Sequence, residues 1–190
     1  MKEQQWRYRM IATRLREEQI IAYPTEGVWG LGCVPESEQA VGRILNLKRR
    51  PWQKGLILVA SELSQLLPYL QSLDSSQRVQ ITSERSDPVT WLVPKSDAVP
   101  LWISGEHDKV AVRLSQHPVV QGICSALKQP IVSTSANPAG KPAALSRLKV
   151  HQYFADRIDY IVPGDLGGAA GASQIIDLVS GDVLREAGTV

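Results

Sequence analysis

The run Leu56-Ile57-Leu58-Val59-Ala60 is five consecutive apolar residues, and it decides the class of fold. A run of this length is too short for a stable helix and is typical of a strand covered on both faces. Other short runs of strand character lie on both sides of it, at 20–23, 89–93, 110–113, 131–132, 160–162, 175–178 and 183–184. Segments of helical character separate them, at 6–18, 36–48, 62–70, 75–84, 117–127 and 145–154. This alternation predicts an α/β fold, in which helices pack against a sheet.

The first of these helices is predicted from apolar residues at helical spacing. Trp6, Met10, Ile11 and Leu15 share one face, and charged residues fill the opposite one. This pattern is typical of an amphipathic helix whose apolar stripe, Trp6 included, packs against the core.

The overall composition is that of an ordinary globular protein. Apolar residues make up 43% and charged residues 21% of the 190 residues, which suits one domain over 1–190 and excludes disordered and fibrous classes. The polar N-terminal segment leads into no apolar run, and no stretch approaches the roughly 20 apolar residues of a membrane span. We therefore expect no signal peptide and no membrane association. Cys33 and Cys124 lie far apart and form no metal-ligand cluster with the histidines, which fits a reduced cytoplasmic protein.

The strongest local signal is the basic loop Lys48-Arg49-Arg50-Pro51. The net charge of the chain is only +2, yet four cations fall within residues 48–54 and no acid lies among them. One interpretation is structural, because cations at the C-terminus of a helix interact favourably with its dipole. The other is an anion site, because clustered cations repel one another until an anion neutralises them, and Arg binds phosphate through two hydrogen bonds. We favour the anion site, with nucleotide phosphates as the anion.

Small polar side chains follow two other predicted strands. Residues 23–32 read Tyr-Pro-Thr-Glu-Gly-Val-Trp-Gly-Leu-Gly, which predicts a buried strand that opens into a glycine-rich loop. Thr25 and Glu26 in this loop are either ligand contacts or caps of a following helix. Residues 131–137 read Ile-Val-Ser-Thr-Ser-Ala-Asn, whose hydroxyls suit an anion or an ordinary turn. Arg113 stands in an apolar strand and needs a buried acid or an anionic ligand as its partner.

The familiar nucleotide-binding motifs do not occur in the sequence. Gly140-Lys141 resembles the end of a P-loop, but the glycine required earlier is replaced by Ser135 and the next residue is Pro142. The glycines at 27, 30 and 32 are not in the order of a dinucleotide fingerprint. Residues 163–173 hold four of the fourteen glycines and predict an irregular loop that is mobile or contacts a ligand. Because the P-loop and the dinucleotide fingerprint are both absent, any nucleotide must bind to another kind of site.

Taken in order, these segments resemble the TsaC/YrdC family, the threonylcarbamoyl-AMP synthases. The matching pieces span nearly the entire chain, and the ordered set is specific where one piece alone would mean little. They are Tyr-Pro-Thr-Glu at 23–26, Gly-Leu-Gly at 30–32, Lys48-x-Arg50-Pro51, Pro-Val-Thr at 88–90, Val112-Arg113, Ser-Thr-Ser-Ala-Asn at 133–137, and Ser173 with Ile175 and Arg185. The resemblance implies a twisted mixed sheet flanked by helices, with a basic concave face.

The resemblance also implies a reaction and its participants. The family makes threonylcarbamoyl-adenylate from L-threonine, bicarbonate and ATP with Mg²⁺, and it releases pyrophosphate. The product feeds the formation of threonylcarbamoyladenosine beside the anticodon of tRNA. The proteins TsaD, TsaB and TsaE are therefore expected pathway partners, and tRNA or double-stranded RNA is a candidate partner. The protein ligands of the metal are left open, with Glu26 as one candidate contact for Mg²⁺ or for an amine.

Carried over by position, the resemblance assigns a nucleotide side and a threonine side. The residues implied on the nucleotide side are Lys48, Arg50, Ser133, Ser135, Asn137 and Arg185. Lys48 and Arg50 would be the catalytic residues, because they hold the ATP phosphates. The residues implied on the threonine side are Thr25, Arg113 and Ser173, with Arg113 pairing the α-carboxylate. Neither Lys48 nor Arg50 has the character of a core residue, so we expect their removal to stop turnover without unfolding the protein.

Three features depart from the family pattern. Gly27 stands where the family more often has Thr, so one hydroxyl contact is missing. Ser86-Asp87 replaces a Pro-Gly pair and adds a negative charge. The matching segments end within one domain, so the lid function of the linker in longer members is not transferred.

Two other functions stay open. A non-catalytic RNA-binding module would use the basic face for phosphate contacts, with Trp29 and Trp52 stacking on bases. The small net charge weighs against RNA binding as the whole function. A carbamoyl-adenylate-forming domain that acts on another carbamoyl donor would share the ATP site without using threonine.

Overall fold

The computed structural model describes residues 2–85 and 87–188. Its α-helices are α1 (Lys2–Arg16), α2 (Glu38–Lys48), α3 (Leu63–Leu66), α4 (Ser75–Thr82), α5 (Leu101–Ser104), α6 (Pro118–Leu127) and α7 (Arg147–Phe154). Single turns of 3-10 helix occupy Trp52–Lys54, Leu67–Tyr69 and Ala155–Arg157. Its strands are β1 (Ile21–Pro24), β2 (Trp29–Gly32), β3 (Ile57–Ala60), β4 (Val89–Pro94), β5 (Lys109–Leu114), β6 (Ile131–Ser135), β7 (Tyr160–Ile161), β8 (Gln174–Asp177) and β9 (Val183–Arg185).

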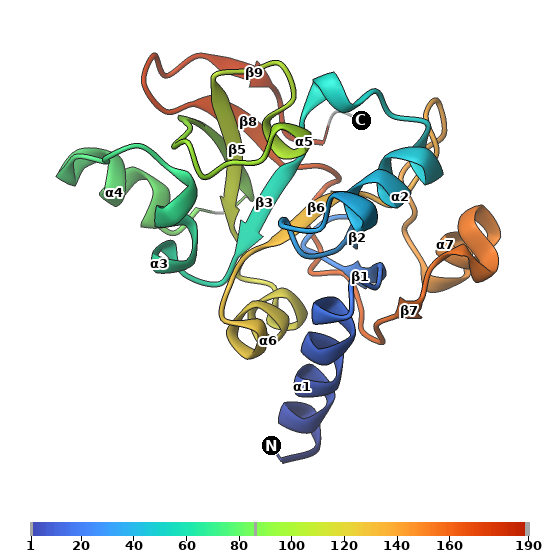
Figure 1. Cartoon of the computed structure of the whole chain (residues 1–190). Helices are drawn as coiled ribbons and strands as arrows, with labels where there is room; N and C mark the ends of the chain where they lie inside the picture. The colour runs from blue at the N-terminus through green and yellow to red at the C-terminus, as the bar shows by residue number, and fades with distance from the viewer. Residues whose placement is uncertain (1, 86, 189–190) are drawn as a thin grey trace.

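Over the described residues the strands form one sheet of mixed direction. Its order is β7-β1-β2-β6-β3-β5-β4-β8-β9. Three neighbouring pairs are parallel, namely β1 with β7, β3 with β5 and β4 with β8, and the other pairs are antiparallel. Helices lie against the sheet on both of its faces (Figure 1). The predicted α/β fold with a mixed sheet is thus confirmed.

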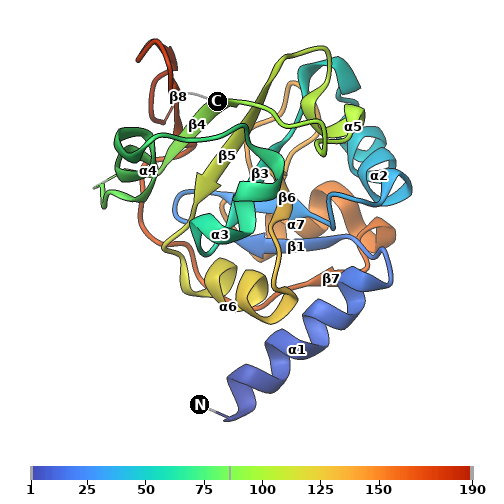
Figure 2. The same cartoon turned by 60° about the vertical axis from the view of Figure 1, so that its left-hand side comes forward.

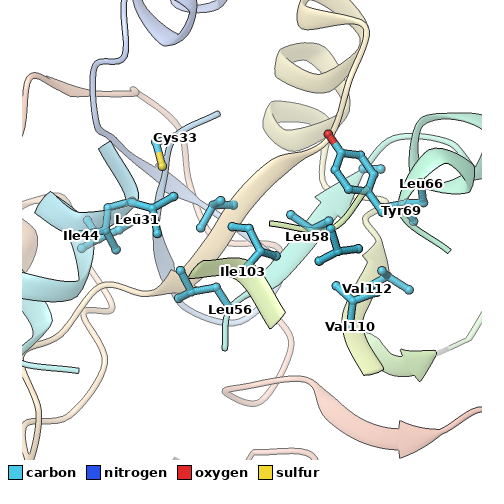
Figure 3. Packing of buried hydrophobic residues seen from close by; sticks show 14 of the residues in the cluster. Leu31, Cys33, Ile44, Leu56, Leu58, Leu66, Tyr69, Ile103, Val110 and Val112 are labelled. Atoms are coloured by element: carbon cyan, nitrogen blue, oxygen red, sulfur yellow. The ribbon is translucent and has the colours of Figure 1, made fainter. Parts of the chain in front are cut away.

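The first face of the sheet carries the larger apolar core. Side chains of α2, α3, α5 and α7 pack there against alternate strand residues, because successive residues of a strand point to opposite faces. Leu31, Leu58 and Val112 contribute from three strands, and Ile44 and Ile103 meet them from α2 and α5 (Figure 3). This layer holds the strands of the site in a fixed register.

Among the described residues, helices cover the second face at one end. There, α1 and α6 lie against the sheet (Figure 2). They pack on a cluster that includes Tyr23, Val59 and Ile131. Further along the same face, Ile57 pairs with Ser133 on one side and with Ala111 on the other, and Ala111 pairs with Leu92. The three apolar members of this row, Ile57, Ala111 and Leu92, are only half-buried. This part of the face can therefore receive a ligand.

The segment after β1 differs from its prediction. Trp29–Gly32 is strand β2, paired with β1 as a hairpin, rather than part of a glycine-rich loop. The glycines misled the prediction because they are there for close packing. A Cβ on Gly32 would lie 2.8 Å from the ring of Tyr23 and 2.6 Å from the carbonyl oxygen of Val132. A glycine inside a strand often marks such a close approach.

Helix α1 follows its prediction except at Trp6. Ile11 and Leu15 are buried, but Trp6 is 66% exposed. Tyr8 hydrogen bonds to the carbonyl of Pro118, the first residue of α6, and Arg16 to that of Leu127, the last. The first turn of α1 therefore runs past the end of its partner helix and projects from the body of the protein (Figures 1 and 2).

Two further predictions concern membranes and cysteines. Among the described residues, no helix combines the length and apolar character needed to cross a membrane. Cys33 and Cys124 are both buried and unpaired with one another. Burial raises the pKa of the Cys124 thiol to about 12, so this side chain behaves as a small apolar core group.

Candidate functional site

Lys48 lies at the last turn of α2, as predicted, but it is buried. Its side chain turns toward the end of β6, where the ammonium donates hydrogen bonds to the main-chain carbonyl of Ser135 and to both oxygens of Asn137. Arg49 follows in the left-handed conformation, with φ of 51°, and points to solvent. The expectation that Lys48 lacks core character is therefore wrong, because its ammonium ties α2 to the chain after β6.

Ser133, Ser135 and Asn137 come together as predicted, and they do so around Lys48. Ser133 and Ser135 are two residues apart in β6, so both point to the second face of the sheet. The hydroxyl of Ser133 accepts a hydrogen bond of 2.7 Å from Tyr23, and that of Ser135 donates one of 2.6 Å to Asn137. Both hydroxyl oxygens keep capacity for one more partner.

Arg50 stabilises its own loop through part of its guanidinium. Its Nε and Nη2 atoms donate to the carbonyl of Gly55, and Nη2 also donates to that of Lys54. Burial lowers the pKa of Arg50, so the surroundings disfavour its charge. A guanidinium carries five donors, and those on Nη1 remain for an anion.

Arg185 and Ser173 form a third cluster with Thr90. Arg185 donates through Nε and Nη2 to the carbonyl of Ser173, at 3.2 and 2.7 Å. The hydroxyls of Ser173 and Thr90 lie 2.7 Å apart, and both residues are buried. Thr90 belongs to the quoted Pro-Val-Thr motif, but no role was predicted for it. Its hydroxyl orients that of Ser173.

Arg113 meets a buried acid, as one of its two predicted alternatives required. Its Nη2 atom lies 3.7 Å from Oε2 of Glu26, and both side chains are largely buried. Ser115 donates a hydrogen bond of 2.6 Å to Oε1 of the same carboxylate. Burial opposes the charged form of Glu26, but Arg113 and the Ser115 hydroxyl outweigh it and hold its pKa below the ordinary value.

The cations of these clusters lie near one another. Burial lowers the pKa of Arg185, and the positive charges of Arg113 and Arg50 lower it further. Burial and the charge of Arg50 lower the pKa of Lys48 to about 7. Four cations thus raise one another's electrostatic potential in a partly buried place. Such a place has a strong affinity for anions.

Thr25 lies beside this group, but its hydroxyl is hydrogen-bonded within its own turn. Its Oγ1 donates a hydrogen bond of 2.7 Å to the carbonyl of Val28, which closes the tight connection between β1 and β2. Neither Thr25 nor Glu26 caps a helix, so that alternative is wrong. A Cβ on Gly27 would lie 1.9 Å from the carbonyl oxygen of Gly171. Threonine, the more common residue in the family, does not fit here without movement of the glycine loop.

The loop 163–173 is irregular, as predicted, and it lies against this turn. The amides of Gly167 and Ala169 donate to the carbonyls of Thr25 and Glu26, at 3.0 and 2.9 Å. Nε2 of His117 lies 2.9 Å from the carbonyl oxygen of Asp165. Ser115 and His117 were not predicted, because only their position two and four residues after Arg113 connects them with the site.

One surface depression lies beside these residues, and another lies away from them. A groove of about 460 Å³ is lined by Glu26, the loop 167–170, the end of α4 and the chain around Asp87. Ser86, which belongs to a predicted departure from the family pattern, lies outside the described residues. A depression of about 590 Å³ lies between residues 61–65 and α6 and contains no predicted site residue. Within 2–85 and 87–188, no three His, Cys, Asp or Glu side chains group as metal ligands.

Comparison with known proteins shows similarity over nearly the whole chain. The model of the family of Sua5, YciO and YrdC proteins, described as "Telomere recombination", matches residues 13–187. A protein named threonylcarbamoyl-AMP synthase from Pseudomonas paraeruginosa is 50% identical over 182 residues, which are 96% of this chain and 98% of that protein. A protein of the same name from Cellvibrio japonicus is 46% identical and covers 92% of each chain.

Solved structures agree with the fold. Sua5 from P. abyssi complexed with L-threonine has a TM-score of 0.89 and 33% identity, and the match covers 97% of this chain and 55% of Sua5. The present chain thus spans about half the length of that protein. YciO from E. coli has a TM-score of 0.83 at 24% identity and covers 96% of this chain and 90% of its own. The chain belongs to the Sua5, YciO and YrdC family.

Proposed function

We propose that this protein is a threonylcarbamoyl-AMP synthase, which joins L-threonine, bicarbonate and ATP into threonylcarbamoyl-adenylate and releases pyrophosphate. One observation carries the proposal. Lys48 and Arg50 from one loop, Arg113 from β5 and Arg185 from β9 come from three distant parts of the chain and gather at one partly buried part of the sheet. A triphosphate and an amino-acid carboxylate together would neutralise this charge, and relatives of this name match almost the entire chain.

The ATP side would lie at Lys48 and the end of β6. Arg50 would bind phosphate through the donors that its loop does not use, and Arg185 would bind from the other side. The hydroxyls of Ser133 and Ser135 and the amide of Asn137 would complete the site, because small polar groups let a phosphate approach the backbone closely. Mg²⁺ would enter with the nucleotide, since phosphate oxygens are ligands that it prefers.

The threonine side would lie at Arg113. Its Nε atom is buried without a hydrogen-bond partner, and a carboxylate is the natural acceptor for it. Ser173, held by Thr90 and Arg185, would contact the substrate from the chain just before β8. Thr25 would contribute through its turn, because its hydroxyl is already bonded to Val28.

The chemistry asks mainly for positioning and charge neutralisation. A carbamate oxygen formed on the threonine nitrogen attacks the α-phosphorus of ATP, and pyrophosphate leaves in line. Donors fixed before the reaction, such as Lys48 and Arg185, stabilise the charge that develops on phosphate oxygens. No covalent enzyme intermediate is needed.

The product would serve the modification of tRNA beside the anticodon in the cytoplasm, with TsaD, TsaB and TsaE as the proteins that consume it. A non-catalytic RNA-binding module is the alternative function. Such a module would place its cations in solvent, as Arg49 is placed, and would gain nothing from the buried contacts of Lys48 and Arg113. These contacts favour the enzyme, and tRNA or double-stranded RNA stays a candidate additional ligand.

Release of pyrophosphate from ATP with Mg²⁺ and bicarbonate, measured with and without L-threonine, tests the function. We expect release to require threonine. Release that proceeds equally without threonine would favour a domain acting on another carbamoyl donor. No release under either condition, together with RNA binding, would favour the RNA module.

ATP binding should weaken as the pH rises above neutrality. The pKa of Lys48 is about 7, so the free protein loses this charge above that pH, while bound phosphate would stabilise the ammonium and raise its pKa. The dissociation constant of a nonhydrolysable ATP analogue should therefore rise by up to about tenfold per pH unit between pH 7.5 and 9. The Lys48→Arg variant, which stays charged, should show a much shallower slope. Equal slopes for the two proteins would contradict this role of Lys48.

A further inference from the structure

Glu26 and Arg113 form an ion pair in which each side chain keeps one buried polar atom without a hydrogen bond. Oε2 of Glu26 and Nε of Arg113 are both buried, and neither has a hydrogen-bond partner. The two side chains are close, but Nη2 of Arg113 stays 3.7 Å from Oε2, beyond hydrogen-bond distance. Buried polar atoms are almost always hydrogen-bonded, and an orphaned atom on a charged group is costly. The pair is therefore arranged for a ligand that supplies both missing bonds.

The ligand that fits must offer a cationic donor and an anionic acceptor side by side. The α-ammonium and α-carboxylate of an amino acid are bonded to the same carbon and meet this need together. We propose that Glu26 binds the α-ammonium of threonine and accepts a proton from it, while Arg113 holds the α-carboxylate. This inference rests on the proposed function. Glu26 thereby becomes a catalytic residue that makes the threonine nitrogen nucleophilic.

The carboxylate is held rigidly enough for this task. Ser115 fixes Oε1 through its hydrogen bond of 2.6 Å, which leaves Oε2 as the free atom. The backbone of Glu26 is fixed by the amide of Ala169 and by the tight packing of Gly27 on Gly171. The groove of about 460 Å³ opens onto Glu26 and gives access to it.

Binding of the substrate changes the proton affinity of Glu26 in the required direction. Burial favours the neutral carboxylic acid, and Arg113 is the largest influence that opposes it. When the substrate carboxylate neutralises Arg113, that influence weakens and the carboxylate of Glu26 becomes a stronger base. The other ionisable groups around it are His117 and Tyr23, with Glu84, Arg85 and Asp87 lining the same groove.

The proposed step balances in atoms and charge. One proton moves from the ammonium nitrogen to Oε2 of Glu26. The freed lone pair attacks the carbon of bicarbonate, the N–C bond forms, and the C–OH bond breaks. The hydroxide leaves as water with a second proton from the nitrogen. The products are the carbamate of threonine, one water molecule and protonated Glu26, which returns its proton to solvent after product release.

The Glu26→Gln variant tests this role, because it keeps the shape and removes the charge. We expect kcat/KM for threonine in pyrophosphate release to fall about 100-fold at pH 7. In this variant only threonine already deprotonated by solvent can react, so the deficit should shrink by about tenfold per pH unit as the pH rises. Lys48 titrates in both proteins, so its effect largely cancels in the ratio. Glu26→Asp, which keeps the charge, should recover part of the activity.

The matched control is Glu62→Gln, which alters an exposed acid that makes no capping hydrogen bond, and it should behave as the wild type. A Glu26→Gln protein with unchanged kcat/KM, or with a deficit that stays constant with pH, overturns the proposal.

If this variant does not fold, as judged by circular dichroism, the proposal is tested on the wild type instead, with 3-hydroxybutyrate as a competitor of threonine. This analogue lacks only the ammonium group and should compete about 100-fold more weakly than threonine, and equal competition overturns the proposal. Absence of threonine-dependent release in the wild type would instead refute the proposed function.

Discussion

Replacing Arg113 by methionine is expected to lower kcat/KM for threonine on the order of 1,000-fold, with little change in KM for ATP. Loss of one partner from a buried, hydrogen-bonded charge pair has effects of this size. The side chain of Arg113 is only 9% exposed. Neither water nor a neighbouring Lys can therefore take over its contact with the carboxylate of threonine. Initial rates of pyrophosphate release at varied threonine and at varied ATP separate the two effects.

The same variant should lose stability, because it leaves Glu26 buried without its cation. Removing one partner of a buried pair costs about 3 kcal/mol. In the wild type, the pKa of Glu26 lies below its ordinary value, so the pair contributes stability above that value and loses it as the pH falls through the folded-state pKa. In the variant burial dominates and raises this pKa, so its deficit should be largest at neutral pH and shrink in acid.

The double variant Arg113→Met with Glu26→Gln separates stability from function. It removes the orphaned charge, so its thermal midpoint at pH 7 should return toward that of the wild type, while turnover stays lost. Recovery of turnover in the double variant would show that Arg113 does not bind the substrate. A single variant as stable at pH 7 as the wild type would show that the ion pair with Glu26 is not formed.

Replacing Arg50 by alanine is expected to reduce kcat/KM for ATP by two to three orders of magnitude, about 3–4 kcal/mol of transition-state stabilisation. Its guanidinium holds the carbonyls of Lys54 and Gly55 and still has donors for phosphate. Arg50→Lys should not restore activity, since an ammonium cannot replace the planar fork of donors. Rates at varied ATP measure both variants.

The neighbouring residue provides the matched control for this prediction. Arg49 has the same side chain and charge, but it is exposed and closes the helix in the left-handed conformation. Arg49→Asn suits that conformation and should keep kcat/KM within about twofold of the wild type, because surface substitutions have small effects. Equal losses in the two variants would mean that the basic loop acts through its overall charge, as an RNA-binding surface would.

The sequence predicted the architecture well where local pattern and burial agree. The apolar run 56–60 became the central strand β3, and the helix that was expected to deliver Lys48 ends at that residue. Strand β2 was missed because its glycines serve the ring of Tyr23, a contact with the adjacent strand of the hairpin. Trp6 was misplaced because the helical pattern does not reveal where α6 begins.

The site was predictable as a set of residue types but not as a set of contacts. Arg113 was known to need a partner, yet Glu26 lies 87 residues away in the chain, and spacing alone could not connect them. Burial of Lys48 was likewise unforeseen, because its acceptors come from the last residue of β6 and the turn that follows. The family resemblance assigned Lys48 and Arg113 to one site, and the fold shows which contacts hold each of them.

Formation of the adenylate in one active site is the central claim, and the product itself tests it most directly. The protein is incubated with ATP, Mg²⁺, L-threonine and ¹³C-labelled bicarbonate, and the nucleotide products are analysed by mass spectrometry. We expect threonylcarbamoyl-AMP that carries one ¹³C atom, and none when threonine is omitted. AMP or ADP without any labelled adenylate, from folded protein, would contradict the claim.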